Sequence, residues 1–249
     1  MAEKSYKFEC LNSNVLKLIA LVTMTIDHVG VIMFPQYEIL RIIGRIAFPI
    51  FAYMISEGCY YTRHKKRYLG ELLIIGGLCQ VVYYLVDKSL NMCILITFAL
   101  SVMIIFAIQW AKKRSDEAEE KESGGFQAAY LTWLLPAALV AGAYIISVSV
   151  PGLVGEKYFS VDYGFVGIMI PVLLFLAHKK WLKLPVLAGS LIILAAVTYN
   201  PVQWWALLAL IPLVFYNGKR GRLRIGQIFY IYYPLHLGVL WGIKYALLI

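Results

Sequence analysis

Residues 14–34 read NVLKLIALVTMTIDHVGVIMF, an apolar stretch that places Asp27 and His28 side by side toward its C-terminal end. As a helix, a stretch of this length extends about 30 Å, which matches the hydrocarbon thickness of a bilayer. A carboxylate and an imidazole at membrane depth are costly to bury and usually have a functional reason to be there. We therefore expect a membrane-spanning helix around which the rest of the chain is organised.

The composition of the whole chain agrees with this interpretation. Of 249 residues, 61% are hydrophobic and 15% are charged, and the mean hydropathy is +0.73. So few polar residues do not cover a soluble globule of this size. The sequence predicts an all-α polytopic integral membrane protein that forms a single transmembrane helical domain over residues 1–249 and contacts membrane lipids.

The net charge of +9 does not indicate a nucleic-acid partner, because the basic residues recur in short runs between apolar segments instead of clustering on one face. The cysteines lie in different segments without metal-ligand spacing, which predicts free thiols and no metal cofactor. The first apolar stretch is too long for the core of a signal peptide and lacks a small-x-small cleavage site, so we expect a retained helix.

Apolar periodicity predicts nine transmembrane helices. The count ranges from eight to ten, because the segments on either side of Asn200 and Pro201 form either one broken helix or a tight hairpin. The expected spans are 14–34, 39–62, 68–86, 93–110, 128–150, 162–178, 184–198, 201–216 and 225–247.

The basic residues of the loops predict the orientation. With nine spans, 18 of the 23 Lys and Arg residues fall on one side, and only Lys88 and Lys157 lie in the opposite loops. Such a bias places the N-terminus in the cytoplasm and the C-terminus outside a cell membrane. Residues 111–126 contain the mixed-charge segment KKRSDEAEEKESGG, which has no apolar period and is expected to be a mobile cytoplasmic loop.

The second span carries Arg41 and Arg45, which are four residues apart and so share a helix face, where like charges repel unless an anion lies beside them. At about 1.5 Å per residue, His28 and Arg45 each lie about 9 Å from the outer end of their helix. Because the connection between the two spans is short, the helices should be antiparallel neighbours that bring Asp27 and His28 level with both arginines.

Adjacent residues on a helix point about 100° apart, so Asp27 is not expected to orient His28 and should pair with Arg45 or Arg41 instead. His28 would then be available as a base for an incoming amine or hydroxyl, or as a transient acyl carrier. The alternative is that these four residues form a buried ion-pair network that only fixes helix packing.

Two sequence motifs resemble a known family. LKLIALVTMTIDHVG, followed by LRIIGRIAFPIFAYMISEGCYYTR, resembles the TraX family, polytopic membrane proteins whose named member is the acetylase of F-type conjugative pilin. The similarity is strong over residues 14–67 and continues through DYGFVG (162–167) and YIYYPLHLGVL (230–240). A looser similarity extends to the wider class of transmembrane acyltransferases, although their first-helix Arg-Gly motif is absent and Glu57 separates Ser56 from Gly58.

The resemblance implies an enzyme that uses acetyl-CoA as acyl donor. It also implies an essential role for His28, supported by Arg41 and Arg45. Basic loops at 63–67 and 219–224 could hold the phosphates of acetyl-CoA, or could serve orientation alone. The acceptor is not specified and could be a protein N-terminus such as that of pilin, a glycan, or a small amine or alcohol. A homodimer would suit such a compact bundle.

Four further residues are candidates for substrate or cofactor binding. His236 lies just after the kink expected at Pro234, and Tyr232 and Tyr233 share its face, so it either lines the cavity or only hydrogen-bonds between helices. Glu57 either pairs locally with Arg63 or contacts the donor. Asp162 either neutralises Arg41 or caps the sixth span.

Other functional classes remain open. Buried Asp, His and Arg residues also occur in ion- or proton-coupled transporters, although we find no internal repeat and no further acidic residue in mid-span. The chain could also be a non-catalytic assembly subunit of an envelope or pilus system.

Overall fold

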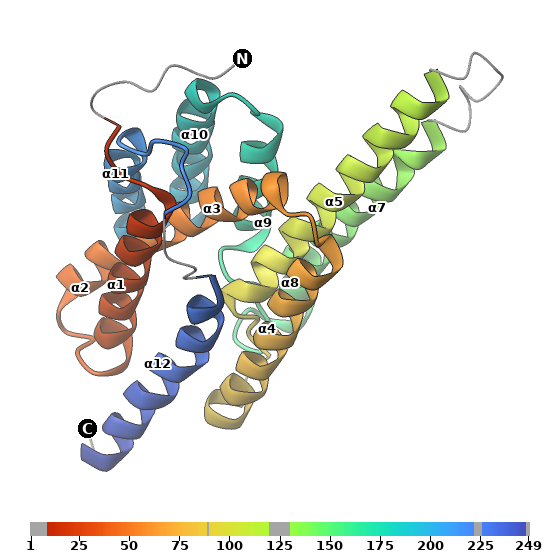
Figure 1. Ribbon diagram of the computed structural model, residues 1–249. Coiled ribbons are helices and arrows are strands. Elements are labelled where there is room, and N and C mark those ends of the chain that lie inside the picture. Colours follow the sequence, from red (N-terminus) through yellow and green to blue (C-terminus); the bar gives the residue numbers. More distant parts are fainter. Residues whose placement is uncertain (1–8, 89, 120–129, 222–225, 248–249) are drawn as a thin grey trace. The chain divides into compact units, whose positions relative to one another are not determined.

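The computed structural model describes residues 9–88, 90–119, 130–221 and 226–247 (Figure 1). Within these residues every regular element is a helix, apart from two isolated β-bridges. The predicted all-α fold is confirmed. The chain folds into two compact units, residues 1–54 with 177–249 and residues 55–176, and the expectation of a single domain stays a prediction.

The first unit is built around α1 (Ser13–Ile32), which packs against α2 and α12 (Figure 1). A 3-10 helix, η2, packs against α2 and α10. The remaining elements of this unit are α2 (Glu38–Gly44), residues 47–54 of α3 (Ala47–Tyr61), α10 (Lys180–Thr198), η2 (Pro201–Ala209), α11 (Leu210–Val214) and α12 (Gly226–Leu247).

Local sequence explains where α1 begins and ends. The Asn12 side chain accepts hydrogen bonds from the backbone N–H groups of Asn14 and Val15, at 3.0 and 3.2 Å, and so caps the first turn. The helix ends at Ile32, shortly before Pro35, which disfavours helical geometry in the residue that precedes it. Over its 20 residues α1 extends about 30 Å, so Asp27 and His28 lie well inside it.

The second apolar stretch is interrupted at Arg45 and Ile46. Glu38–Tyr61 is one apolar span of 24 residues, but α2 ends at Gly44 and α3 begins at Ala47. Pro49 explains the break, because it has no N–H to offer the Arg45 carbonyl and its ring crowds that carbonyl. Arg45 remains linked to the preceding turn through its N–H, which donates to the Arg41 carbonyl at 3.1 Å.

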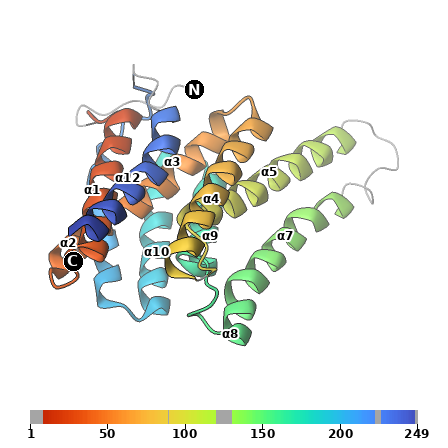
Figure 2. The ribbon, with the colours of Figure 1, turned by 90° about the horizontal axis from the view of Figure 1, so that it is seen from below.

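The second unit is centred on α5 (Ile94–Glu119), which packs against α4, α7 and α9; α5 and α7 run side by side in Figure 2. Backbone bonds from Leu90 to Tyr158 and from Met92 to Ser160 join the loop before α5 to the loop before α9. The other elements are residues 55–61 of α3, α4 (Lys65–Asp87), α7 (Leu134–Tyr144), a π-helix η1 (Ile145–Ser149), α8 (Val150–Val154) and α9 (Gly164–Leu176).

The charged segment expected as a loop at 111–126 is helical as far as Glu119, where α5 ends. Lys113 and Arg114 each lie 3.6 Å from Glu117, at the helical spacings i,i+4 and i,i+3. Such pairs support a helix even where the sequence has no apolar period. Residues 120–126 lie outside the described part of the chain.

Six helical segments among the described residues are long and apolar enough to cross a membrane, and two shorter apolar helices accompany them. The protein is therefore a multi-pass membrane protein. The described parts of all nine expected spans are largely helical, but their number as membrane crossings and their orientation stay predictions. The six segments are Ser13–Ile32, Glu38–Tyr61, Lys65–Leu85, Ile94–Ala118, Tyr130–Val154 and Lys180–Thr198.

Candidate functional site

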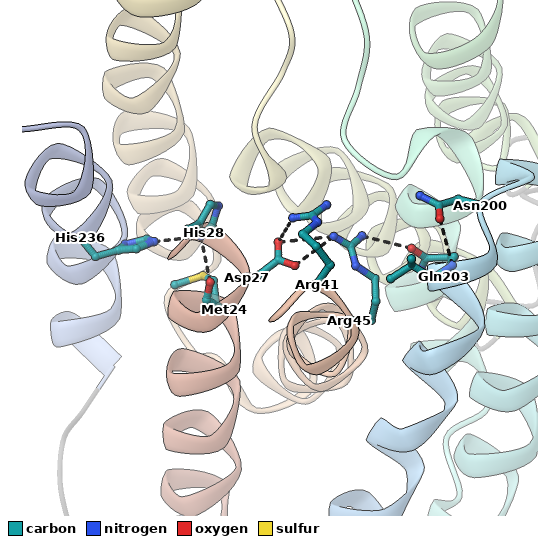
Figure 3. Close-up of polar contacts among 9 residues, drawn as sticks. Met24, Asp27, His28, Arg41, Arg45, Asn200, Gln203 and His236 are labelled. Atoms are coloured by element: carbon teal, nitrogen blue, oxygen red, sulfur yellow. Dashed lines mark hydrogen bonds and ion pairs between the residues drawn. The ribbon is translucent and has the colours of Figure 1, made fainter. Parts of the chain in front are cut away.

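Asp27 bridges both arginines of the second apolar stretch (Figure 3). Its Oδ2 atom lies 2.7 Å from Nη1 of Arg41, and its Oδ1 atom lies 3.1 Å from Nη2 of Arg45. The Asp27 and Arg45 side chains are only 17% and 10% exposed, whereas that of Arg41 is 32% exposed. The predicted pairing of Asp27 is confirmed, and the carboxylate separates two positive charges that would otherwise repel each other.

Arg45 connects this ion pair to η2. Its Nη1 atom donates to Oε1 of Gln203 at 3.2 Å, and Gln203 is 4% exposed. Asn200 begins the 3-10 helix by accepting a hydrogen bond from the Val202 N–H at 3.0 Å, which fixes the turn that carries Gln203 (Figure 3). Among the described residues, the buried Nε2 atom of Gln203 has no hydrogen-bond partner.

Gln203 was missed in the sequence analysis. The signal that could have revealed it is a primary amide within the otherwise apolar segment 201–216, since a buried amide requires hydrogen-bond partners. Its partner Arg45 is 158 residues away in the chain, so no local pattern predicts the contact.

His28 and Asp27 face different neighbours, as the helical geometry predicted. Its Nδ1 atom lies 3.0 Å from the Met24 carbonyl oxygen, one turn earlier in α1, and 3.1 Å from Nε2 of His236 in α12. His236 is 6% exposed, and its own Nδ1 atom lies 2.9 Å from the Tyr232 carbonyl oxygen. Of the two roles considered for His236, the structure shows the hydrogen bond between helices.

Aromatic and hydroxyl groups of α12 surround this histidine pair. Tyr233 is buried and places its ring edge-on to both imidazoles, at centroid distances of 6.3 Å to His28 and 5.6 Å to His236. The Tyr232 hydroxyl lies 2.6 Å from Oγ1 of Thr25, and its ring stacks on His236 at 5.1 Å. Thus α12 is held against α1 at two successive turns.

Asp27 and His28 therefore divide the site into two halves (Figure 3). On one side the Asp27 carboxylate and two guanidinium groups form a charged network that ends at Gln203. On the other side two imidazoles share a hydrogen bond. A carboxylate occupied by arginines is a poor base, whereas an imidazole without an ion-paired acid can accept a proton.

Two of the expected site residues lie in the second unit. Glu57 is half-buried on α3. Asp162 lies two residues before α9, where its N–H donates to the Met92 carbonyl at 3.1 Å and its carbonyl accepts from Thr97 Oγ1 at 2.8 Å. The structure pairs Arg41 with Asp27. Roles for Glu57 and Asp162 in substrate binding stay predictions.

Basic residues gather at the N-terminal ends of α1 and α10 within the first unit. Lys180 binds Glu9 and the Tyr216 carbonyl, and the buried Lys183 lies 5.3 Å from the centre of the Tyr53 ring. Lys17, on the first turns of α1, is close enough to Arg220 for electrostatic repulsion. Lys180 and Lys183 are thus engaged within the protein, whereas Lys219 and Arg220 in the loop before α12 are exposed.

All four cysteines are free thiols, as predicted, with Cys10 exposed and Cys59, Cys79 and Cys93 buried. Within the described part of the chain, no three His, Cys, Asp or Glu side chains are grouped closely enough to hold a metal ion.

Comparison with known proteins gives a family. Residues 12–244 match the family described as TraX protein. A probable fimbrial assembly protein FimC, serogroup H1, from Dichelobacter nodosus is 24% identical over 238 residues, which cover 92% of this chain and 94% of that protein. Uncharacterized protein RP591 of Rickettsia prowazekii (strain Madrid E) is 35% identical over 94 residues, which cover 37% of this chain and 36% of that protein.

No solved structure matches the chain. The family match extends over nearly the whole sequence and includes α1, α2, η2 and the part of α12 that carries His236. The protein is therefore a member of the TraX family.

Proposed function

We propose that this protein is a membrane-embedded acetyltransferase that moves an acetyl group from cytosolic acetyl-CoA to an acceptor at or beyond the outer face of the cell membrane. The observation that carries the proposal is the setting of His28, which is held by Met24 and His236 while Asp27 is occupied by two arginines. The similarity to the pilin acetylase of the family supports acetyl transfer.

The chemistry asked of His28 is proton transfer. Acetyl-CoA supplies an activated thioester. The His28 imidazole takes the proton of an acceptor amine or hydroxyl, the acceptor atom bonds to the acetyl carbon, and the carbon–sulfur bond breaks. The sulfur then receives the proton from His28, so that acetylated acceptor and free thiol are the products. If His28 first carries the acetyl group itself, a bond between its ring nitrogen and the acetyl carbon forms as the carbon–sulfur bond breaks, and this bond breaks in turn when the acceptor atom bonds to the acetyl carbon, with the acceptor proton passing to the thiolate.

The donor has a candidate binding surface in the same unit as His28. Acetyl-CoA carries several phosphate charges, and the exposed Lys179, Lys219 and Arg220 lie near the N-terminal ends of α10 and α1. In the predicted orientation this surface faces the cytoplasm, where the donor is. Lys and Arg side chains recognise phosphates through charge-assisted hydrogen bonds.

A role in assembly is the second candidate, because the Dichelobacter nodosus relative is described as a probable fimbrial assembly protein. In that case the Asp27 network would fix helix packing without chemistry. The two candidates differ in one requirement: only the enzyme needs acetyl-CoA and an intact His28.

The test uses the full chain in lipid nanodiscs with acetyl-CoA labelled in the acetyl group. Membranes containing pilin and glycolipid serve as a mixed source of acceptors. We expect the wild type to bind the donor and transfer label, and His28→Ala to reduce transfer about 100-fold or more, the contribution typical of a general base. The exposed His178→Asn is the matched control and should retain full transfer.

Unchanged transfer in His28→Ala would reject the catalytic role of this residue. If the wild type neither binds acetyl-CoA nor transfers label, while cells without the protein lose surface fimbriae, assembly becomes the better description.

A further inference from the structure

We infer that His236 is a positioning residue that holds His28 in the tautomer whose Nε2 atom carries the lone pair. Its importance for turnover rests on the proposed function, but the tautomer itself is a property of the folded protein. The inference assigns to α12 a part in the chemistry of α1, from which it is separated by most of the chain.

Hydrogen-bond geometry selects the tautomer. The Met24 and Tyr232 carbonyl oxygens accept hydrogen bonds and never donate them. They lie 3.0 Å from Nδ1 of His28 and 2.9 Å from Nδ1 of His236, so each of these nitrogens must carry a hydrogen. A neutral imidazole has one hydrogen on its two nitrogens, and the Nε2 atoms of both rings are therefore acceptors.

The contact between the two rings fits this assignment. The Nδ1 atom of His28 lies 3.1 Å from Nε2 of His236, so the hydrogen on Nδ1 can be donated to the lone pair on Nε2. His28 shares this hydrogen between Met24 and His236, and all three contacts are satisfied by two hydrogens. In the opposite tautomer of His28, a lone pair on Nδ1 would face both the Met24 carbonyl oxygen and the Nε2 lone pair of His236, so loss of His236 would remove one of the two acceptors that disfavour this tautomer.

The result is that the lone pair of His28 lies on Nε2, the ring nitrogen that does not contact Met24 or His236. Within the described residues, every hydrogen bond of His28 involves Nδ1, and none is made by Nε2. When Nε2 accepts a proton, the Nδ1–H bond to His236 becomes charge-assisted and strengthens. His236 thus accepts a hydrogen bond from Nδ1 at the position that a carboxylate takes in a serine-protease triad, although without the carboxylate's charge, while Asp27 remains committed to Arg41 and Arg45.

A second contact fixes the register that this arrangement needs. Thr25 Oγ1 lies 2.6 Å from the Tyr232 hydroxyl. Thr25 is three residues before His28 in α1, and Tyr232 is four residues before His236 in α12. Residues three and four apart lie on one helix face, so the two contacts lock α1 and α12 at adjacent turns. The Tyr232 ring also stacks on His236 with an interplanar angle of 7°, which limits rotation of the imidazole.

The direct test is ¹⁵N NMR of ring-labelled histidine in the full chain in lipid, because protonated and unprotonated ring nitrogens give well-separated resonances. Replacing the exposed His64 and His178 by Asn leaves only His28 and His236 labelled. We expect His28 to show an unprotonated Nε2, and we expect His236→Leu to shift the population toward protonated Nε2. A protonated Nε2 on neutral His28 in the parent protein, or no change in His236→Leu, would overturn the inference.

The activity arm compares two replacements of His236. His236→Gln keeps an acceptor at the position of Nε2, whereas His236→Leu fills similar space without one. We expect His236→Leu to lower kcat about 100-fold with little change in the KM for acetyl-CoA, and His236→Gln to restore most of the loss. Equal losses in both variants at equal thermal stability would contradict a positioning role. Lack of acetyl transfer in the wild type would instead reject the proposed function, and the NMR result would then decide the inference.

Discussion

Gly44 makes room for Asp27. A Cβ atom built at position 44 would lie 2.1 Å from Oδ1 of Asp27 and 2.3 Å from its Cβ atom, closer than side chains ever approach. The carboxylate therefore occupies the space that any other residue at the end of α2 would fill. Close approach of helices through small residues is a common way to pack them in a membrane, and here it brings an acid against the turn that holds Arg45.

Gly44→Ala should destabilise the protein because the added methyl group displaces Asp27 from both arginines. We expect the free energy of unfolding to fall by about 2–4 kcal/mol, as for overpacking combined with a disturbed buried ion pair. Gly189→Ala on α10 is the matched control, since nothing lies within 4 Å of its added Cβ and alanine favours helix. Thermal unfolding in detergent measures both, and equal midpoints would disprove the close contact.

Asp27→Leu should lower the free energy of unfolding more than removal of both Asp27 and Arg45. It leaves Arg41 and Arg45 together without their shared carboxylate, which costs about 3–5 kcal/mol for a buried pair. The double variant Asp27→Leu with Arg45→Met removes one of the two guanidinium charges that Asp27 neutralises, and it should recover part of the lost free energy of unfolding. A double-mutant cycle by denaturant unfolding checks the sign, and additive losses would argue against coupling.

Arg45→Lys should cost more than Arg41→Lys. Arg45 donates from two different nitrogens, to Gln203 and to Asp27, and a single ammonium cannot reproduce that fork. We expect a loss of about 1–3 kcal/mol in the free energy of unfolding for Arg45→Lys, and less than about 1 kcal/mol for the more exposed Arg41→Lys. The reverse order would show that Gln203 is not a significant partner.

Cys10 offers a test of orientation that needs no engineered cysteine. It is the exposed thiol, whereas Cys59, Cys79 and Cys93 are buried. A membrane-impermeant maleimide should label the protein once in inside-out vesicles, because the N-terminus is predicted to be cytoplasmic. Cys10→Ser should abolish this labelling. Efficient labelling in right-side-out vesicles would reverse the predicted topology.

The sequence was sufficient to predict the all-α fold and the first half of the site. Apolar periodicity locates the spans, and a short connection makes α1 and α2 neighbours, so the pairing of Asp27 with the arginines follows from spacing and charge. The helical extension of α5 to Glu119 was not predicted, because its stability comes from charged side chains at helical spacing instead of an apolar face.

The second half of the site depends on contacts that no local pattern contains. His236 was a candidate, but its bond to His28 depends on how α12 is rotated against α1, and the two residues are 208 positions apart. Gln203 likewise meets Arg45 only after η2 packs against α2. The interruption at Arg45 has a local signal in Pro49, but that signal is not sufficient by itself, because Pro171, Pro185 and Pro234 lie inside continuous helices.

The position of the Asp27–Arg41 ion pair has a consequence for biosynthesis. Both residues belong to the α1–α2 hairpin, whose helices are synthesised one directly after the other, so they can enter the membrane with their charges already matched, avoiding part of the insertion penalty of about 2.5–3.5 kcal/mol for each ionised residue. His28 has no such early partner, because His236 in α12 is synthesised 208 residues after it. A nascent chain that stops before α12 would thus have its Asp27 charge paired, yet its His28 imidazole would be held by the Met24 carbonyl alone until α12 has been made.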